Sequence, residues 1–166
     1  MSNTARVSRN LERLCERRGY TNPEETVNSP YTEYVHPNGG KVLVCNYSTK
    51  VLVALSAELV KMIEAANYTQ VLVCAPTYSP AAKSTLIALS VHIYTHLELS
   101  IDIMIQLPAH RKVTIEEVNE EFGLKVNPDD LPPIRLTDPA VKYYDFQLGD
   151  IIRVDEKSPQ IWVVQE

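Results

Sequence analysis

Residues 130–144 read DLPPIRLTDPAVKYY, and this stretch marks the architecture of the C-terminal third of the chain. Its first half is rich in proline and acid, which is typical of an irregular connection. Asp138-Pro139 then predicts a helix start, because proline is favoured at the first helical position. We expect this helix to end at the turn of residues 147–150, which read QLGD.

Short elements are predicted on both sides of this stretch. Upstream, Thr114 and Glu117 have the spacing of a capping box, in which a hydroxyl and a carboxylate satisfy free backbone N–H groups at a helix start. Downstream, residues 151–154 and 161–165 have the apolar pattern of strands. With the change of composition at Pro108, these elements predict a small α+β domain over residues 108–166.

The first 107 residues predict a layered α/β domain. Apolar side chains recur at helical spacing in some segments and alternate or run together in others. Asn38-Gly39-Gly40 is typical of a hairpin turn, and Ser79-Pro80 of a helix start. The expected elements are helices over 4–18, 52–66 and from Ser79 to about His96, and strands over 31–35, 41–45, 70–74 and 99–106.

The composition is that of a soluble intracellular protein. The 166 residues are 45% apolar, which is enough for an ordinary core. There is no run of about eighteen apolar residues and no apolar N-terminal stretch, so no membrane partner is expected. Cys15, Cys45 and Cys74 are odd in number and widely spaced, which favours buried thiols over a disulfide framework or a metal site.

The net charge of −5 is unevenly distributed. Residues 1–107 hold nine cationic and nine anionic side chains, whereas residues 108–166 hold seven and twelve. Because phosphate neutralisation supplies most nonspecific affinity for nucleic acid, we expect no strong DNA binding by the chain alone. The first helix carries a basic stripe, which mixed surface charge explains most simply because acidic residues interrupt it. The stripe consists of Arg6, Arg9, Arg13 and Arg17.

Two enzymatic interpretations find little support. A nuclease needs carboxylates and a lysine that converge on metal ions, but Asp102 is a lone acid and Asp155-Glu156-Lys157 lies in a turn of the other domain. His92 and His96 have a spacing that could ligate zinc on a helix, yet Ile93 stands where a zinc protease has glutamate. The sequence therefore predicts no catalytic residue, no metal and no cofactor.

The motifs around residues 130–144 are similar to those of one protein family. In order, they match the Leu-Pro-x-Ile, Asp-Pro and Gly-x-hydrophobic series that opens the assembly domain of the fifth subunit shared by the eukaryotic nuclear RNA polymerases and of its archaeal counterpart. Such an ordered series is more specific than a single short motif. Upstream stretches agree in order and extend the resemblance to nearly the whole chain: residues 14–20, 71–73, 79–83 and 107–110.

The resemblance implies an α/β jaw domain with restriction-endonuclease-like layers at residues 1–107 and an α+β assembly domain at 108–166. It implies a non-catalytic subunit of a DNA-dependent RNA polymerase, with the largest subunit and other polymerase subunits as partners. Downstream duplex DNA would be a weak, nonspecific partner. The implied docking residues are Leu131, Pro132, Ile134, Asp138, Pro139, Tyr144 and Gly149, and the implied DNA contacts are Ser79, Pro80, Ala81, Ala82 and Lys83.

The chain also departs from the family. Its closing hairpin, residues 154–162, is shorter and lacks the family's Arg-x-Ser-x-Thr-Ala-Gly segment, and the region between Tyr20 and Tyr31 is abbreviated. These departures favour a divergent lineage such as that of a large DNA virus. The expected location is the nucleus for a cellular protein, and the infected cell's cytoplasm or the virion for a viral one. An independent protein-binding adaptor with the same fold is the alternative function.

Overall fold

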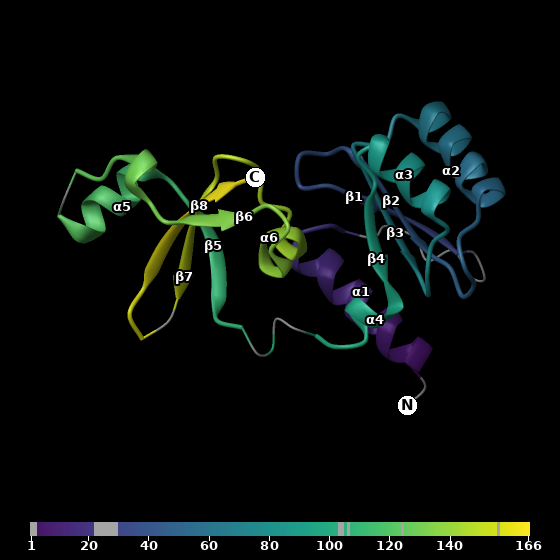
Figure 1. The fold of residues 1–166 in the computed structure, drawn as a ribbon, viewed down its shortest axis with the longest axis horizontal. Coiled ribbons are helices and arrows are strands. Elements are labelled where there is room, and N and C mark those ends of the chain that lie inside the picture. The colour runs from purple at the N-terminus through teal and green to yellow at the C-terminus, as the bar shows by residue number, and fades with distance from the viewer. Residues whose placement is uncertain (1–2, 22–29, 103–104, 106, 124, 156) are drawn as a thin grey trace. The chain divides into compact units, whose positions relative to one another are not determined.

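The chain divides into two compact units, Met1–Ile101 and Asp102–Glu166, each built around its own four-stranded sheet (Figure 1). The computed structural model describes residues 3–21, 30–102, 105, 107–123, 125–155 and 157–166. The division falls six residues before the boundary expected from composition. In the described part of the chain, no helix has the length and apolarity needed to cross a membrane.

The sheet of the first unit has the order β1-β2-β3-β4. Strands β1 (Tyr31–Val35) and β2 (Lys41–Asn46) form the expected antiparallel hairpin, whereas β3 (Gln70–Ala75) and β4 (His92–Thr95) add in parallel. Val42 to Cys45 and Val71 to Ala75 are buried without a break. Continuous burial arises because helices cover both faces of these two central strands.

Helices on both sides make the first unit a three-layer structure (Figure 1). On one side, α2 (Val53–Ala66) and α3 (Pro80–Ala88) contribute Leu59, Ala82 and Leu86 to a core with alternate residues of β2 and β3. On the other side lie α1 (Asn3–Arg17) and the short α4 (His96–Leu99). The two are tied together by a hydrogen bond of 2.8 Å from Asn10 Nδ2 to the Leu99 carbonyl.

The cysteines are free, buried thiols, as the sequence predicts. Burial is the main reason that the pKa of each thiol is raised to about 12. At neutral pH they are therefore protonated and act as small apolar groups of the first unit's core, since the thiolate is the reactive form.

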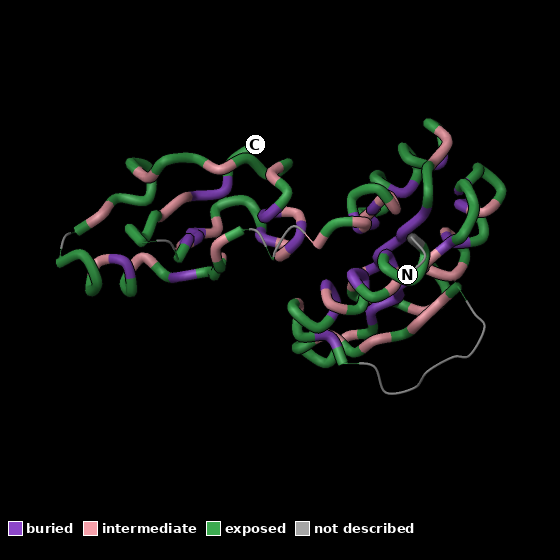
Figure 2. Tube along the Cα trace, turned by 90° about the horizontal axis from the view of Figure 1, so that it is seen from below, coloured by how far each residue is buried: buried purple, intermediate pink, exposed green. Residues whose placement is uncertain are grey.

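The sheet of the second unit has the order β5-β7-β8-β6 and two differently covered faces. The strands are β5 (Ala109–Val113), β6 (Pro133–Arg135), β7 (Ile151–Asp155) and β8 (Gln160–Gln165). Helix α6 (Pro139–Tyr144) packs Val141 on Ile152 and Val164, while α5 (Ile115–Phe122) packs Val118 on Val113 and Ile151 at the opposite face. A 3-10 turn at Pro128–Asp130 leads into β6. Figure 2 shows buried stretches in both units, with longer ones in the first.

Two expectations for residues 79–106 are wrong. The helix that begins at Pro80 ends at Ala88, and Ser90 takes a left-handed φ of 57° before β4 begins. The segment 91–95 is rich in β-branched and aromatic residues, and its pairing with β3 outweighs the helical spacing of its apolar residues. None of the described residues in the predicted strand 99–106 belongs to a strand, and Leu99 is instead the last residue of α4. Residues 103, 104 and 106 lie outside the described part.

Candidate functional site

An open groove of about 600 Å³ crosses the second unit on the sheet face that carries α6. Its floor combines β7, β8 and β6, because alternate residues of a strand share a face and Val154, Trp162 and Ile134 therefore point the same way. The start of α6 and the segment before β5 form its edges. The lining residues are Leu107, Pro108, His110, Pro133, Ile134, Arg135, Thr137, Asp138, Pro139, Val154, Gln160 and Trp162.

The start of α6 is fixed by its own cap. The Asp138 carboxylate accepts a hydrogen bond of 2.8 Å from the Ala140 backbone N–H, and Pro139 takes the first helical position, as expected. A carboxylate at this position satisfies one of the free N–H groups of the helix. Asp138 is therefore a structural cap at the edge of the groove.

His110 occupies the β5 side of the groove. Its Nδ1 lies 2.7 Å from the Pro108 carbonyl oxygen, which can only accept, so Nδ1 carries a proton. The imidazole also lies beside Tyr144, with ring centroids 6.1 Å apart. These two contacts fix the orientation of the ring. The second ring nitrogen, Nε2, takes part in neither of them.

The seven predicted docking residues do not gather at one place. Ile134, Asp138 and Pro139 line the groove. Leu131 packs in the core under α5, and Tyr144 packs beside Phe146 in the core under α6. Gly149 forms a turn with a φ of 83°, where glycine avoids backbone strain, and the Pro132 carbonyl accepts from the Val163 N–H. These last four shape the unit without lining the groove.

Sequence reasoning missed most of the residues that line the groove, including Trp162, Arg135 and Val154. In the sequence, Trp162 is the last residue of the shortened closing hairpin. The register of β7 with β8 places Ile152 opposite Trp162, which sets the indole on the α6 face. Alternation along β8 could have indicated that Trp162 and Val164 share a face, although not which strand lies beside them.

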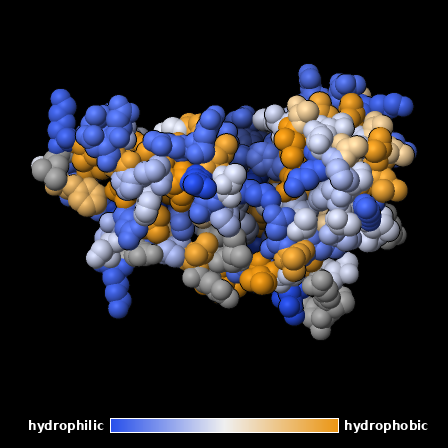
Figure 3. All heavy atoms as spheres, viewed as in Figure 1, coloured by the Kyte–Doolittle hydropathy of each residue, from blue (hydrophilic) through white to orange (hydrophobic). Residues whose placement is uncertain are grey.

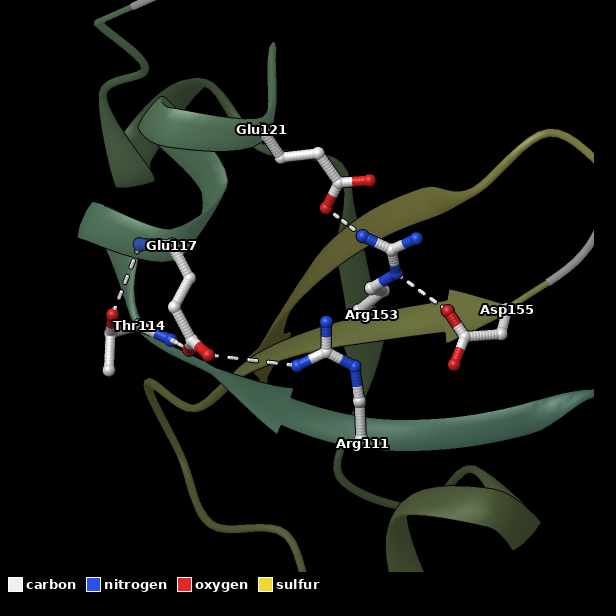
Figure 4. A network of polar contacts seen from close by, with 6 residues as sticks. All are labelled: Arg111, Thr114, Glu117, Glu121, Arg153 and Asp155. Atoms are coloured by element: carbon white, nitrogen blue, oxygen red, sulfur yellow. Dashed lines mark hydrogen bonds and ion pairs between the residues drawn. The ribbon is translucent and has the colours of Figure 1, made fainter. Parts of the chain in front are cut away.

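The opposite sheet face carries an ion-pair network that holds α5 (Figure 4). Arg153 is only 15% exposed and pairs with Glu121 of α5 and with Asp155, the latter at 2.6 Å. Arg111 lies 3.8 Å from Glu117, whose carboxylate also closes the capping box by accepting from the Thr114 N–H at 2.7 Å. The expected capping box is thus confirmed. The network fixes α5 and leaves the groove face free of these charges.

The second predicted site, residues 79–83, forms the start of α3 in the first unit. Ser79 Oγ accepts from the Ala82 N–H at 3.3 Å, and Pro80 follows at the first helical position. Pro80, Ala81 and Lys83 are exposed, whereas the side chain of Ala82 is fully buried in the core and unavailable to a ligand. Apolar side chains also reach the surface at Leu52 and Val53, which directly follow the residue that bridges to Tyr78. Figure 3 shows hydrophobic groups interspersed with hydrophilic ones.

The start of α3 is anchored to the sheet through Tyr78. This residue forms a β-bridge with Val51, and the Ser79 N–H donates to the Val51 carbonyl at 3.0 Å. The Tyr78 hydroxyl lies 2.8 Å from the Val73 carbonyl and 2.9 Å from the Tyr94 carbonyl. Residues of β3 and β4, with Val51 just before α2, therefore fix this tip.

The histidine pair considered for zinc is not on one helix. His92 lies in β4, where Arg18 Nη1 approaches its Nδ1 at 3.4 Å and Gln70 approaches its Nε2 at 3.3 Å. His96 is the first residue of α4. No group of three His, Cys, Asp or Glu side chains that could hold a metal occurs among the described residues. The basic stripe of α1 is also engaged, since Arg9, Arg13 and Arg17 each make polar or electrostatic interactions.

His96 makes the stability of the chain depend on pH. Desolvation lowers the pKa of its imidazole below 6.5, partly opposed by a hydrogen bond to the Tyr47 backbone, and Nε2 is buried without a partner among the described residues. Because the unfolded chain then binds the proton more readily, stability is lost as the pH falls through about 6.5. We expect His96→Gln to reduce the loss of stability between pH 7.5 and 5.5. Urea unfolding of both chains at each pH tests this, and equal losses would contradict it.

Comparison with known proteins places the second unit among polymerase subunits. The family model described as RNA polymerase Rpb5, C-terminal domain, matches residues 100–162. The chain is 38% identical over 65 residues to DNA-directed RNA polymerase subunit Rpo5 of Pyrococcus horikoshii, covering 37% of this chain and 77% of that subunit. It is 41% identical over 54 residues to Rpo5 of Staphylothermus marinus, covering 32% of this chain and 59% of that subunit.

The similarity to solved structures is lower. A structure of EndoMS in its apo form shows 13% identity and a TM-score of 0.40, covering 54% of this chain and 45% of the other. A repair endonuclease from Pyrococcus abyssi shows 14% identity and the same TM-score, covering 55% and 45%.

Proposed function

Because the chain belongs to the family of RNA polymerase subunits Rpb5 and Rpo5, we propose that it is a non-catalytic subunit of a multisubunit DNA-dependent RNA polymerase. The observation that carries the proposal is the match at 38% identity over 77% of the length of an archaeal Rpo5. The matched family model lies almost entirely within the second unit. We therefore assign attachment to the polymerase to this unit.

The second unit is proposed to dock on the largest polymerase subunit. Its groove supports this role, because it joins apolar residues of three strands to the start of α6 and includes Ile134, Asp138 and Pro139 from the family motif. Interface cores are typically apolar with a few polar anchors. The remaining motif residues support docking indirectly by shaping the unit.

The first unit is proposed to line the downstream DNA channel and help to hold the duplex during transcription. The start of α3 supports this role, because helix N-termini present N–H donors and a positive dipole end to phosphate. Pro80 and Ala81 offer no base-specific donors, so the contact would be positional rather than sequence-reading. Catalysis and its metal ions would belong to other subunits of the enzyme.

Affinity purification tests the proposed function. The full chain, carrying a tag, should co-purify with the large polymerase subunits in its native host, and mass spectrometry of the eluate identifies them. The Lys125→Asp variant is a control for a change of surface charge, because Lys125 is exposed. It should co-purify as the wild-type chain does. Recovery of an unrelated protein complex without any polymerase subunit would favour the independent adaptor.

The tip of α3 gives a second expected outcome. Pro80→Glu with Lys83→Glu places carboxylates where phosphate would lie, so the assembled polymerase should hold downstream duplex less tightly. The logarithm of the binding constant falls linearly with the logarithm of the salt concentration. Losing one phosphate contact should make this slope shallower by about one unit. A salt series of duplex-binding measurements with wild-type and variant polymerase tests this.

A matched control separates contact from general charge repulsion. Ala57→Glu with Lys61→Glu makes the same change of charge on exposed residues of α2. This control should incorporate into the polymerase and bind duplex as wild type does. If both double variants bind alike, the tip has no special role in holding DNA.

A further inference from the structure

The loop that joins β2 to α2 is anchored at both ends and carries three exposed polar residues between its anchors. At its start, the Tyr47 N–H donates to the Cys74 carbonyl at 2.9 Å, and at its end the Val51 N–H donates to the Thr77 carbonyl at 3.0 Å. Tyr47 and Val51 are buried, whereas residues 48–50, which read STK, are exposed. The anchors therefore hold a short polar segment at the surface of the first unit.

The register of this loop places Lys50 beside the segment that leads into α3. Val51 forms a parallel bridge with Tyr78, and both side chains pack in the core under α2 and α3. Because side chains alternate along an extended segment, the preceding residues, Lys50 and Thr77, point away from that core. Both are exposed. Lys50 and Thr77 are therefore neighbours on the surface, a few residues before α3 begins at Pro80.

The two segments that meet here are cationic, although the first unit as a whole is close to neutral. Residues 46–52 and 76–89 contain Lys50 and Lys83 and no acidic residue, whereas residues 1–107 hold nine cationic and nine anionic side chains. Neither lysine forms an ion pair with any residue that the structure describes. Glu98, which follows β4 at the same edge of the sheet, is engaged by the capping box of α4. This edge therefore presents uncompensated positive charge.

The chemistry of these segments suits phosphate groups rather than base edges. Lysine side chains, serine and threonine hydroxyls and the N–H groups of a helix start are the groups with which proteins contact phosphate oxygens. Ser48, Thr49 and Thr77 supply such hydroxyls close to Lys50 in the chain or across the bridge. Arginine, asparagine and glutamine bind base edges through paired hydrogen bonds, and none of them occurs in residues 47–51 or 76–83.

We infer that Lys50, with Thr77 beside it, contacts the phosphate backbone of the downstream duplex next to the contact proposed for the start of α3. The inference rests on the proposed DNA-facing role of the first unit and deepens it, because it adds a second segment of the chain to the same surface. The contact is independent of base sequence. Its affinity is modest, since one cation neutralises one phosphate.

Neutralising Lys50 tests the contact in the assembled polymerase. Lys50→Gln should make the salt dependence of duplex binding shallower by about one unit, and Lys50→Gln with Lys83→Gln by about two units, because each lysine meets its own phosphate. Lys41→Gln is the matched control. Lys41 is exposed and begins β2, whereas Lys50 follows the end of the same strand, so the two lie at opposite edges of the sheet. The control should retain the wild-type slope.

Site-specific crosslinking gives a second readout that does not depend on affinity. A photoreactive group attached to Lys50→Cys should crosslink to the downstream duplex, at the same positions in duplexes of different sequence. The label is selective, because the native cysteines are buried thiols. The same group on Lys41→Cys should not reach the duplex. Crosslinking of the Lys50→Cys chain to a polymerase subunit instead of DNA would assign this surface to a protein and overturn the inference.

The salt series separates the inference from the function on which it rests. If Lys83→Gln changes the slope and Lys50→Gln does not, the start of α3 keeps its role and the inference is wrong. Equal changes in the Lys50→Gln and Lys41→Gln variants would also overturn it, since they would reflect net charge alone. A wild-type slope for both Lys50→Gln and Lys83→Gln would remove the DNA-facing role as well. Membership of the polymerase is decided independently, by co-purification.

Discussion

The Val141→Asp variant should not co-purify with polymerase, although its first unit remains folded. Val141 is 1% exposed in the core between α6 and the sheet, together with Phe146, Ile152 and Val164. An unpaired carboxylate buried there costs several kcal/mol. A core of this size supplies only about 3–5 kcal/mol, so the second unit should unfold.

Limited proteolysis and affinity purification together measure this outcome. The second unit should be digested while the first survives, and polymerase subunits should be absent from the eluate. Lys125→Asp also introduces an aspartate, at an exposed position of the same unit, and should behave as wild type. Normal co-purification of the Val141→Asp variant would show that polymerase binding does not depend on this unit.

The Leu72→Ala variant should have the converse effect. Leu72 lies in β3 and is fully buried, and helices cover both faces of this strand. Removing such a side chain destabilises a domain by about 2–5 kcal/mol, through lost burial and the cavity that remains. The first unit should therefore unfold at lower urea concentration, while the chain still joins the polymerase.

Hydrogen exchange of the β3 amides during a urea series measures the loss, and affinity purification measures assembly. Leu52→Ala is a control for the loss of leucine alone, because Leu52 is 54% exposed. It should change stability by less than about 0.5 kcal/mol. If the Leu72→Ala chain is lost from the polymerase as completely as the Val141→Asp chain, the two units do not have separate roles.

Local signals in the sequence predicted several element starts well. Thr114 with Glu117, Ser79-Pro80 and Asp138-Pro139 each begin a helix as expected, because caps depend on a few neighbouring residues. The same capping-box pattern is present at Thr95 and Glu98, where both of its hydrogen bonds form. This pattern would have predicted the start of α4 and an earlier end for the helix that begins at Pro80.

Pairing between distant segments was harder to predict. Strand β4 looks helical by its apolar spacing and becomes a strand because β3 offers it a partner edge. Strand β6 has only three residues, one of them proline, and was expected to be irregular. The groove joins residues from four strands and a helix start, so no single stretch of sequence reveals it.

The anchoring of Tyr78 also has a mechanical consequence. Its hydroxyl contacts carbonyls of β3 and β4, and its backbone bridges to Val51 before α2. A load applied at the start of α3 is therefore carried directly into the strands rather than absorbed by a loop. Moving the tip requires breaking the two hydrogen bonds of the Tyr78 hydroxyl and the bridge to Val51 together, which makes it a stiff element. Under the proposed DNA-facing role, a duplex advancing past this tip would meet a fixed guide rather than a compliant arm.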